Sequence, residues 1–241
     1  MDDATAPLVS IVIPVYNEEA ILHAAIVDLR DKLRDVPWSY EIIIAENGSR
    51  DGTVEISNEL SARFAEVTSF SVGEPNYGKA LRKGILRARG TFVVCEEIDL
   101  CDTDFHQAAL RILQDRSADL VIGSKLLSES SDERPWARNA ASRIYNGMLR
   151  VTLGFRGTDT HGLKAFRREP LLPIVNRCVV DKDVFASEFV IRAYRDQVAI
   201  REIPVRVMEK RPPSINLVKR VPNVMKQVAR LAWAIRVHRG D

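Results

Sequence analysis

Five short apolar runs recur along the first half of the chain, and each of the first four is followed by a segment with helical periodicity. The runs are Leu8–Val15, Glu41–Ala45, Val67–Val72, Thr91–Cys95 and Leu120–Ile122. Between them, apolar residues recur every three or four positions, as they do on one face of an α-helix. Strands that alternate with amphipathic helices are typical of a mostly parallel sheet covered on both faces. The pattern therefore predicts an α/β fold.

Local signals predict where the first helix begins and ends. Asn17 is a good N-cap residue, and Glu18 and Glu19 follow it where the helix dipole favours negative charge. We therefore expect this helix to begin at Asn17 and to end at Pro37, which cannot continue it.

The second half is less regular. Helices are expected at Ala140–Leu149 and Asp183–Tyr194, and a late strand at Ala199–Val207. Ser128–Arg134 is expected to be a mobile surface loop. We predict a single domain over residues 1–215, followed by a C-terminal helix over residues 216–241 that packs on it.

This C-terminal segment differs from the rest of the chain in charge. Val205–Asp241 carries nine Lys or Arg against two Asp or Glu, whereas the remainder has a net charge of −5. Leu217–His238 is amphipathic, and its polar arc includes Lys219, Lys226, Arg230 and Trp233. A basic stripe with a Trp suits an anionic membrane surface, and a solvated basic face is the alternative. No nucleic-acid partner is expected, because the whole chain is near neutral and lacks a known module.

Other classes of protein are excluded by what the sequence lacks. The cysteines, Cys95, Cys101 and Cys178, are odd in number and form no CxxC pair, so neither a disulfide framework nor a zinc site is indicated. No signal peptide and no membrane span is predicted. We expect a cytoplasmic protein that is either soluble or peripheral on the inner membrane face. There is also no G-x-G-x-x-G after the first strand and no phosphate-binding P-loop.

Polar clusters follow the first four predicted strands. They are Pro14–Glu18, Glu46–Ser49, Asn76–Lys79 and Glu96–Asp99. The carboxyl ends of parallel strands meet at one edge of a sheet, where open α/β folds bind ligands. Carboxylates repel a diphosphate unless a divalent cation lies between them, and Mg²⁺ typically takes one or two carboxylates plus phosphate oxygens. Glu97 and Asp99, two residues apart, are the candidate pair.

Several stretches together resemble a family 2 glycosyltransferase with the GT-A fold, close to the dolichyl- or polyprenyl-phosphate mannose synthases. They are Ile11–Glu19, Tyr40–Thr53, Asn76–Gly90, Glu97–Leu100, Gly123–Lys125 and Ile203–Val205. The resemblance implies that a nucleotide-sugar donor is held by Pro14, Tyr16, Glu18, Glu46 and Lys79. It implies that Glu97-Ile98-Asp99 binds Mg²⁺ or Mn²⁺ and the donor diphosphate. Lys125 matches a basic phosphate contact, and a late basic residue matches Lys210 or Arg211.

The chain departs from the family pattern at several positions. The usual Asp-Asp before Gly-Ser is Glu46-Asn47, and the usual Asp-x-Asp is Glu97-Ile98-Asp99. Glu96 precedes this pair and is an alternative to Glu97 as the metal ligand. The segment Asp159–Lys164 resembles the acceptor-side motif but is one residue short.

The resemblance implies an inverting transfer of a hexose from GDP-mannose or a UDP-hexose to a polyprenyl phosphate. Transfer to a soluble or glycan hydroxyl and non-catalytic binding of a nucleotide sugar are the alternatives. A hydroxyl acceptor needs a general base, for which Asp159 and Glu188 are candidates, each equally open to a structural role. His161 is a candidate on the acceptor side, whereas His23, His106 and His238 are expected on helix surfaces.

Overall fold

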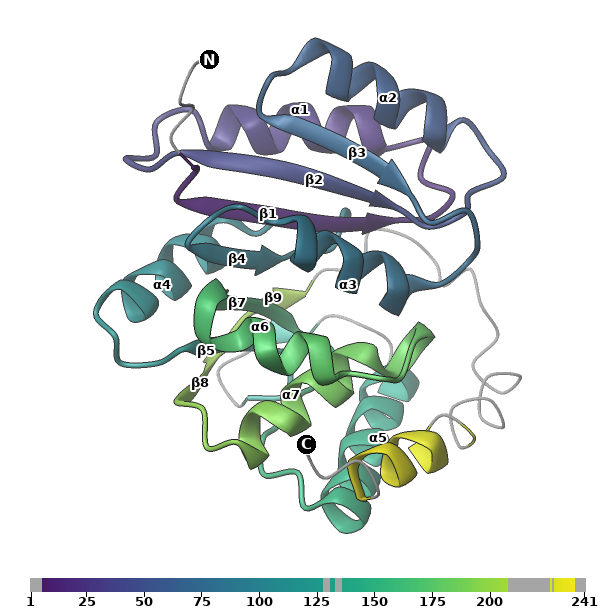
Figure 1. The fold of residues 1–241 in the computed structure, drawn as a ribbon, viewed down its shortest axis with the longest axis vertical. Coiled ribbons are helices and arrows are strands. Elements are labelled where there is room, and N and C mark those ends of the chain that lie inside the picture. Colours follow the sequence, from purple (N-terminus) through teal and green to yellow (C-terminus); the bar gives the residue numbers. More distant parts are fainter. Residues whose placement is uncertain (1–5, 128–130, 133–135, 208–225, 227, 237–241) are drawn as a thin grey trace.

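A computed structural model describes residues 6–127, 131–132, 136–207, 226 and 228–236 (Figure 1). Its main sheet has the strand order β3-β2-β1-β4-β7-β5-β8, in which only β7 runs antiparallel to its neighbours. The strands are β1 (Val9–Val15), β2 (Tyr40–Glu46), β3 (Val67–Ser71), β4 (Phe92–Cys95), β5 (Leu120–Ser124), β7 (Leu163–Arg167) and β8 (Ile200–Pro204). The predicted mostly parallel α/β sheet is confirmed.

Helices cover both faces of this sheet. They are α1 (Leu22–Lys32), α2 (Thr53–Arg63), α3 (Tyr77–Arg87), α4 (Thr103–Gln114), α5 (Trp136–Leu153), α6 (Arg168–Arg177) and α7 (Phe185–Arg195), with a 3₁₀ turn η1 (Lys182–Val184) before α7. Ile11 and Ile13 of β1 pack with α1, α2 and α4, whereas Val12 between them packs with α3, α6 and α7 (Figure 1). Alternate residues of a strand point to opposite faces, so β1 is apolar throughout because both of its faces are buried.

The predicted start of the first helix is wrong. Helix α1 begins at Leu22 and ends at Lys32, well before Pro37. Asn17 has a φ of 54°, and its side chain accepts a hydrogen bond from the backbone N–H of Arg50. Asn tolerates this left-handed conformation and bonds locally, so here it builds a turn instead of capping a helix.

The late strand predicted at Ala199–Val207 is split between two sheets. Its first part is β8, and its end, β9 (Arg206–Val207), pairs with β6 (Ser131–Asp132) in a separate two-stranded sheet. The predicted loop at Ser128–Arg134 therefore contributes a short strand. Strand β7 and helix α6 were not predicted, because Lys164 interrupts the apolar run of β7 and Pro173 lies inside α6.

Of the predicted C-terminal helix, residues 226 and 228–236 are described, and they are helical. Val228, Leu231 and Ile235 are buried against the domain, while Trp233 is 60% exposed. Lys210, Arg211, Lys219 and His238 lie outside the described residues. In the described part of the chain, no helix is both long enough and apolar enough to cross a membrane.

Candidate active site

Hydrogen bonds join the four polar clusters at the carboxyl edge of the sheet. The backbone N–H of Asn17 donates to Ser49 Oγ at 2.9 Å, which links the first cluster to the second. Asn47 Oδ1 accepts from the N–H of Asn76, which links the second to the third. The Tyr77 hydroxyl donates to Glu97 Oε1 at 3.3 Å, which links the third to the fourth. Segments distant in sequence thus meet at one site, as the strand-end argument predicts.

The residues predicted to hold the donor differ in their exposure and in their contacts. Pro14 is buried in β1. The pairing of β1 with β4 ends at Val12, so the N–H that proline lacks is not needed for a hydrogen bond to β4. Tyr16 is 40% exposed beside the site. Glu18 is half-buried, and its N–H donates to Thr53 Oγ1 at 2.8 Å. The Lys79 ammonium pairs with Glu74 at the surface.

The Glu46 side chain forms hydrogen bonds with the turn that follows β2 and with the end of β3. It is 2% exposed, and its two carboxylate oxygens accept hydrogen bonds from the backbone N–H of Ser49 and from the Ser71 hydroxyl. Burial acts to raise the pKa of Glu46, but these donors outweigh it and the pKa is lowered. Glu46 therefore stays ionised and fixes the turn that faces the site.

Glu97 and Asp99 lie on the turn that follows β4. The N–H groups of Leu100 and Cys101 donate to the Glu97 carbonyl oxygen, which closes this turn. Ile98 is buried between the two carboxylates, while Glu97 is half-buried and Asp99 exposed. Burial, followed by the negative charge of Asp99, raises the pKa of Glu97 to about 7.

This carboxylate pair fits a divalent cation. Each charge makes the other less favourable, and a cation between them would relieve that repulsion. The described residues contain no group of three or more His, Cys, Asp or Glu that could hold a metal by themselves. A hard cation that takes two carboxylates and completes its shell with phosphate oxygens and water matches this donor set.

Glu96, the alternative metal ligand, faces away from this pair. Its Oε1 accepts from the N–H of Glu97 at 2.9 Å. Its Oε2 accepts from the N–H of Asp102 and lies 2.6 Å from His106 Nε2. The expectation of a surface position for His106 is wrong, because its side chain is fully buried against Glu96.

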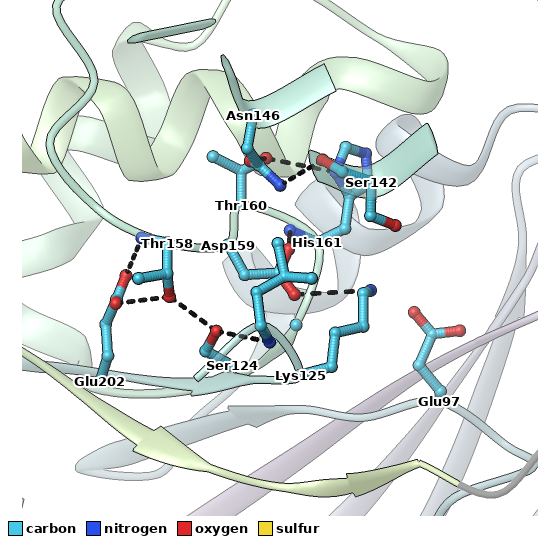
Figure 2. Close-up of polar contacts among 12 residues, drawn as sticks. Glu97, Ser124, Lys125, Ser142, Asn146, Thr158, Asp159, Thr160, His161 and Glu202 are labelled. Atoms are coloured by element: carbon cyan, nitrogen blue, oxygen red, sulfur yellow. Dashed lines mark hydrogen bonds and ion pairs between the residues drawn. The ribbon is translucent and has the colours of Figure 1, made fainter. Parts of the chain in front are cut away.

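Three further charged side chains lie on the side of the site that faces Glu97. They are Lys125, which follows β5, Asp159 in the loop before β7, and Lys164 in β7. Lys125 Nζ lies 3.5 Å from Asp159 Oδ2, and Figure 2 shows the Lys125 side chain between Asp159 and Glu97. Burial acts to raise the pKa of Asp159, but Lys125 and the His161 N–H outweigh it and the pKa is lowered. Asp159 is therefore a buried, ionised carboxylate.

Lys164 ends the segment Asp159–Lys164 that resembles the acceptor-side motif, but no role was predicted for this residue by itself. It is 3% exposed, and its Nζ donates to the Gly162 carbonyl oxygen at 2.7 Å. Burial lowers its pKa, and the charges of Asp159 and Glu97 oppose that shift. The available signal was a lysine inside a short apolar run, which is rare unless the charge has a partner.

The loop that carries Asp159 is fixed from the opposite side by Glu202 of β8. The Glu202 carboxylate accepts from the N–H and the hydroxyl of Thr158 at 2.8 and 2.6 Å. The Thr158 hydroxyl also lies 2.6 Å from Ser124 Oγ, which precedes Lys125 (Figure 2). Gly162 packs so closely on the Gly123 carbonyl that a Cβ would collide with it.

Polar side chains from α5 and α7 close the site behind His161. Ser187 donates to Thr160 Oγ1 at 2.9 Å and lies 2.9 Å from the Tyr145 hydroxyl. The rings of Tyr145 and His161 meet edge to face, with centroids 5.1 Å apart.

Glu188, the second candidate base, is fully buried and fully engaged. Its Oε2 accepts from the N–H groups of Val179 and Val180, and its Oε1 pairs with Arg192. These contacts assign Glu188 a structural role.

Comparisons with known proteins agree with this architecture. Glucosyl-3-phosphoglycerate synthase from Mycobacterium tuberculosis, in complex with UDP, superimposes with a TM-score of 0.65, covering 95% of this chain and 80% of that chain at 22% identity. A complex of the same enzyme with Mn²⁺, UDP and glucosyl-3-phosphoglycerate gives a TM-score of 0.64 at 21% identity, covering 95% of this chain and 79% of that one. The expected GT-A fold is confirmed.

Curated relatives are glycosyltransferases. AglD of Haloferax volcanii is 29% identical over 235 residues, which are 95% of this chain and 38% of that protein. Dolichyl-phosphate beta-glucosyltransferase ALG5D of Trichomonas vaginalis is 28% identical over 215 residues, 82% of this chain and 64% of that protein. The chain thus spans less than two thirds of the length of these relatives. The sequence profile of glycosyl transferase family 2 matches residues 10–173, more than half of the chain, and this protein belongs to that family.

Proposed function

We propose that this chain is a metal-dependent, inverting hexosyltransferase that acts from a nucleoside-diphosphate sugar onto a polyprenyl phosphate at the inner face of a membrane. The observation that carries the proposal is the Glu97 and Asp99 pair, which faces Lys125 and Lys164 across one site. Two carboxylates and two ammonium groups match a diphosphate that is held through a cation on one side and by direct charge on the other.

The donor would lie along the clusters after β1, β2 and β4. Exposed Tyr16 would stack on the nucleoside base, and Glu46 would hold the turn that it forms with Ser49. Glu97 and Asp99 would hold Mg²⁺ or Mn²⁺, which would neutralise the charge that develops on the leaving diphosphate. Lys125 would stabilise the same charge directly. The solved complexes with UDP and the relatives named for polyprenyl or dolichyl phosphate favour this donor and acceptor class.

A phosphate acceptor is already anionic and needs no general base. Its negative charge would be attracted by Lys125 and Lys164, which lie opposite the donor carboxylates. The surface of the C-terminal helix, with Lys226, Arg230 and Trp233 exposed, would bring the protein to the anionic membrane that holds such an acceptor.

A hydroxyl acceptor is the second candidate, and one contact favours it. Asp159 Oδ2 is buried, has Lys125 at 3.5 Å and has no hydrogen-bond donor among the described residues. A substrate hydroxyl could donate to this oxygen, and Asp159 would then act as the general base.

Transfer of labelled sugar from UDP-glucose or GDP-mannose, with Mg²⁺ or Mn²⁺, tests the proposal. Label that moves into the organic phase with a polyprenyl phosphate supports the lipid acceptor, whereas label in a water-soluble product supports the hydroxyl acceptor. If the protein binds the nucleotide but neither transfers nor hydrolyses the donor, it is a non-catalytic binding protein.

A further inference from the structure

Helix α5 has one face on the active site and another in solvent. On the inner side, Tyr145 contacts Ser187, and Asn146 Oδ1 accepts from Thr160 at 3.4 Å. On the outer side, Ile144 is 72% exposed and Val151 is 89% exposed. Residues seven apart lie on the same face of a helix, so these two apolar side chains form a stripe that points away from the core.

The described C-terminal helix, residues 226 and 228–236, lies beside α5 (Figure 1). Arg236 Nη2 donates to the Thr152 carbonyl oxygen at 2.9 Å, and Arg195 donates to the carbonyl oxygens of both Ile235 and Leu153. Trp233 on this helix is also exposed. Among the described residues, three of the six exposed large apolar or aromatic side chains therefore lie on these two adjoining helices.

The same two helices carry only positive charge. The sequence of α5 contains three arginines and no Asp or Glu, and residues 226–236 contain Lys226, Arg230 and Arg236 with no acidic residue. In the rest of the chain the numbers of acidic and basic residues are nearly balanced. Exposed apolar side chains on two helices that carry basic but no acidic residues match an anionic lipid bilayer, which offers negative headgroups above an apolar layer.

We propose that α5 and the C-terminal helix together form one surface that docks on an anionic bilayer, with Ile144, Val151 and Trp233 entering the headgroup layer. Docking through α5 would bring its inner side, and so the acceptor side of the site, close to the lipid. The functional reason for docking, delivery of the acceptor to the site, rests on the proposed lipid-phosphate acceptor. The docking itself does not depend on that proposal.

Vesicle binding of the full chain tests the surface without donor or metal. The chain is sedimented with phosphatidylcholine vesicles that contain or lack phosphatidylglycerol, at low and high salt. We expect binding only to the anionic vesicles, weakened by salt. The double variant Ile144→Gln with Val151→Gln should bind at least tenfold more weakly, whereas Val179→Gln, which alters an exposed valine elsewhere, should bind normally.

Charge is tested by a matched pair of double variants. Lys226→Glu with Arg230→Glu should lose binding, while Lys83→Glu with Arg111→Glu, the same charge change on exposed residues of α3 and α4, should lose far less. Equal losses would mean that only net charge matters and would overturn a defined docking surface.

Three further results would overturn the proposal. One is wild-type vesicle binding by the Ile144 and Val151 variant. Another is a lower melting temperature of that variant without vesicles, which would show that the chain itself covers these residues. The third is a wild-type dimer in light scattering that becomes a monomer in the variant, which would show that a second copy of the chain covers this surface. Loss of docking with retained transfer to a water-soluble short-chain polyprenyl phosphate would leave the proposed function standing, so the two failures are distinguishable.

Discussion

Glu96 and His106 form a fully buried pair in which Oε2 and Nε2 lie 2.6 Å apart. The same carboxylate accepts hydrogen bonds from the N–H groups of Glu97 and Asp102, at the two ends of the turn that carries Asp99. This pair therefore joins the proposed metal-binding turn to helix α4. A buried carboxylate with three partners holds backbone geometry, so we propose cation binding for Glu97 and Asp99 and not for Glu96.

Asp99→Asn should abolish metal-dependent binding of a nucleoside diphosphate. Asp99 is exposed, so the substitution removes a charged ligand without disturbing the core. Calorimetry with UDP or GDP and Mn²⁺ should show no metal-dependent heat, while thermal unfolding stays as in the wild type. Unchanged binding would remove Asp99 from the site.

Glu97→Gln and Glu96→Gln should have opposite profiles. Glu97→Gln removes a proposed metal ligand, so activity should fall sharply with little change in stability. Glu96→Gln should cost about 1–3 kcal/mol of unfolding free energy in urea, because buried charged hydrogen bonds are lost, and should reduce activity less. His106→Gln should resemble Glu96→Gln. A greater activity loss from Glu96→Gln would shift the metal ligand by one residue.

Metal affinity should fall as the pH drops through about 7. Burial and the charge of Asp99 raise the pKa of Glu97 to about 7, so the free site takes up a proton below that pH. A protonated carboxyl is a poor ligand, and the apparent affinity should weaken roughly tenfold for each pH unit below the pKa. Titration of Mn²⁺ binding with UDP from pH 8 to about pH 5.5 measures this. The Glu97→Gln variant should lose this dependence, and a flat wild-type profile would contradict it.

Glu202→Ala should impair the acceptor side of the site selectively. The variant frees the Thr158 N–H and hydroxyl, which fix the loop that carries Asp159. Small misplacements of site groups can cost up to about a hundredfold in rate, so kcat should fall by about tenfold or more while donor affinity is retained. Arg201→Ala, on the same strand but exposed, is the control. Equal losses of donor binding and turnover would indicate general unfolding of this region.

The layered α/β architecture and the edge of the sheet at which the site lies were predictable from the sequence. Five apolar runs that alternate with helical periodicity require a sheet that is buried on both faces, and the carboxyl ends of its parallel strands share one edge. The clusters around Asn17, Glu46, Asn76 and Glu97 were therefore predictable as neighbours. These are local patterns, and the physics that produces them acts over a few residues.

The side chains that face those clusters could not be predicted, because long-range packing brings them there. Strand β7 runs antiparallel between β4 and β5 and brings Lys164 and Asp159 opposite Glu97. A five-residue strand with a buried lysine is stable only where its neighbours supply backbone partners and countercharges, and those neighbours lie far away in sequence. The same holds for His106, whose helix position resembles a surface site until Glu96 is packed against it. Pairing of this kind depends on distant contacts, which local periodicity does not encode.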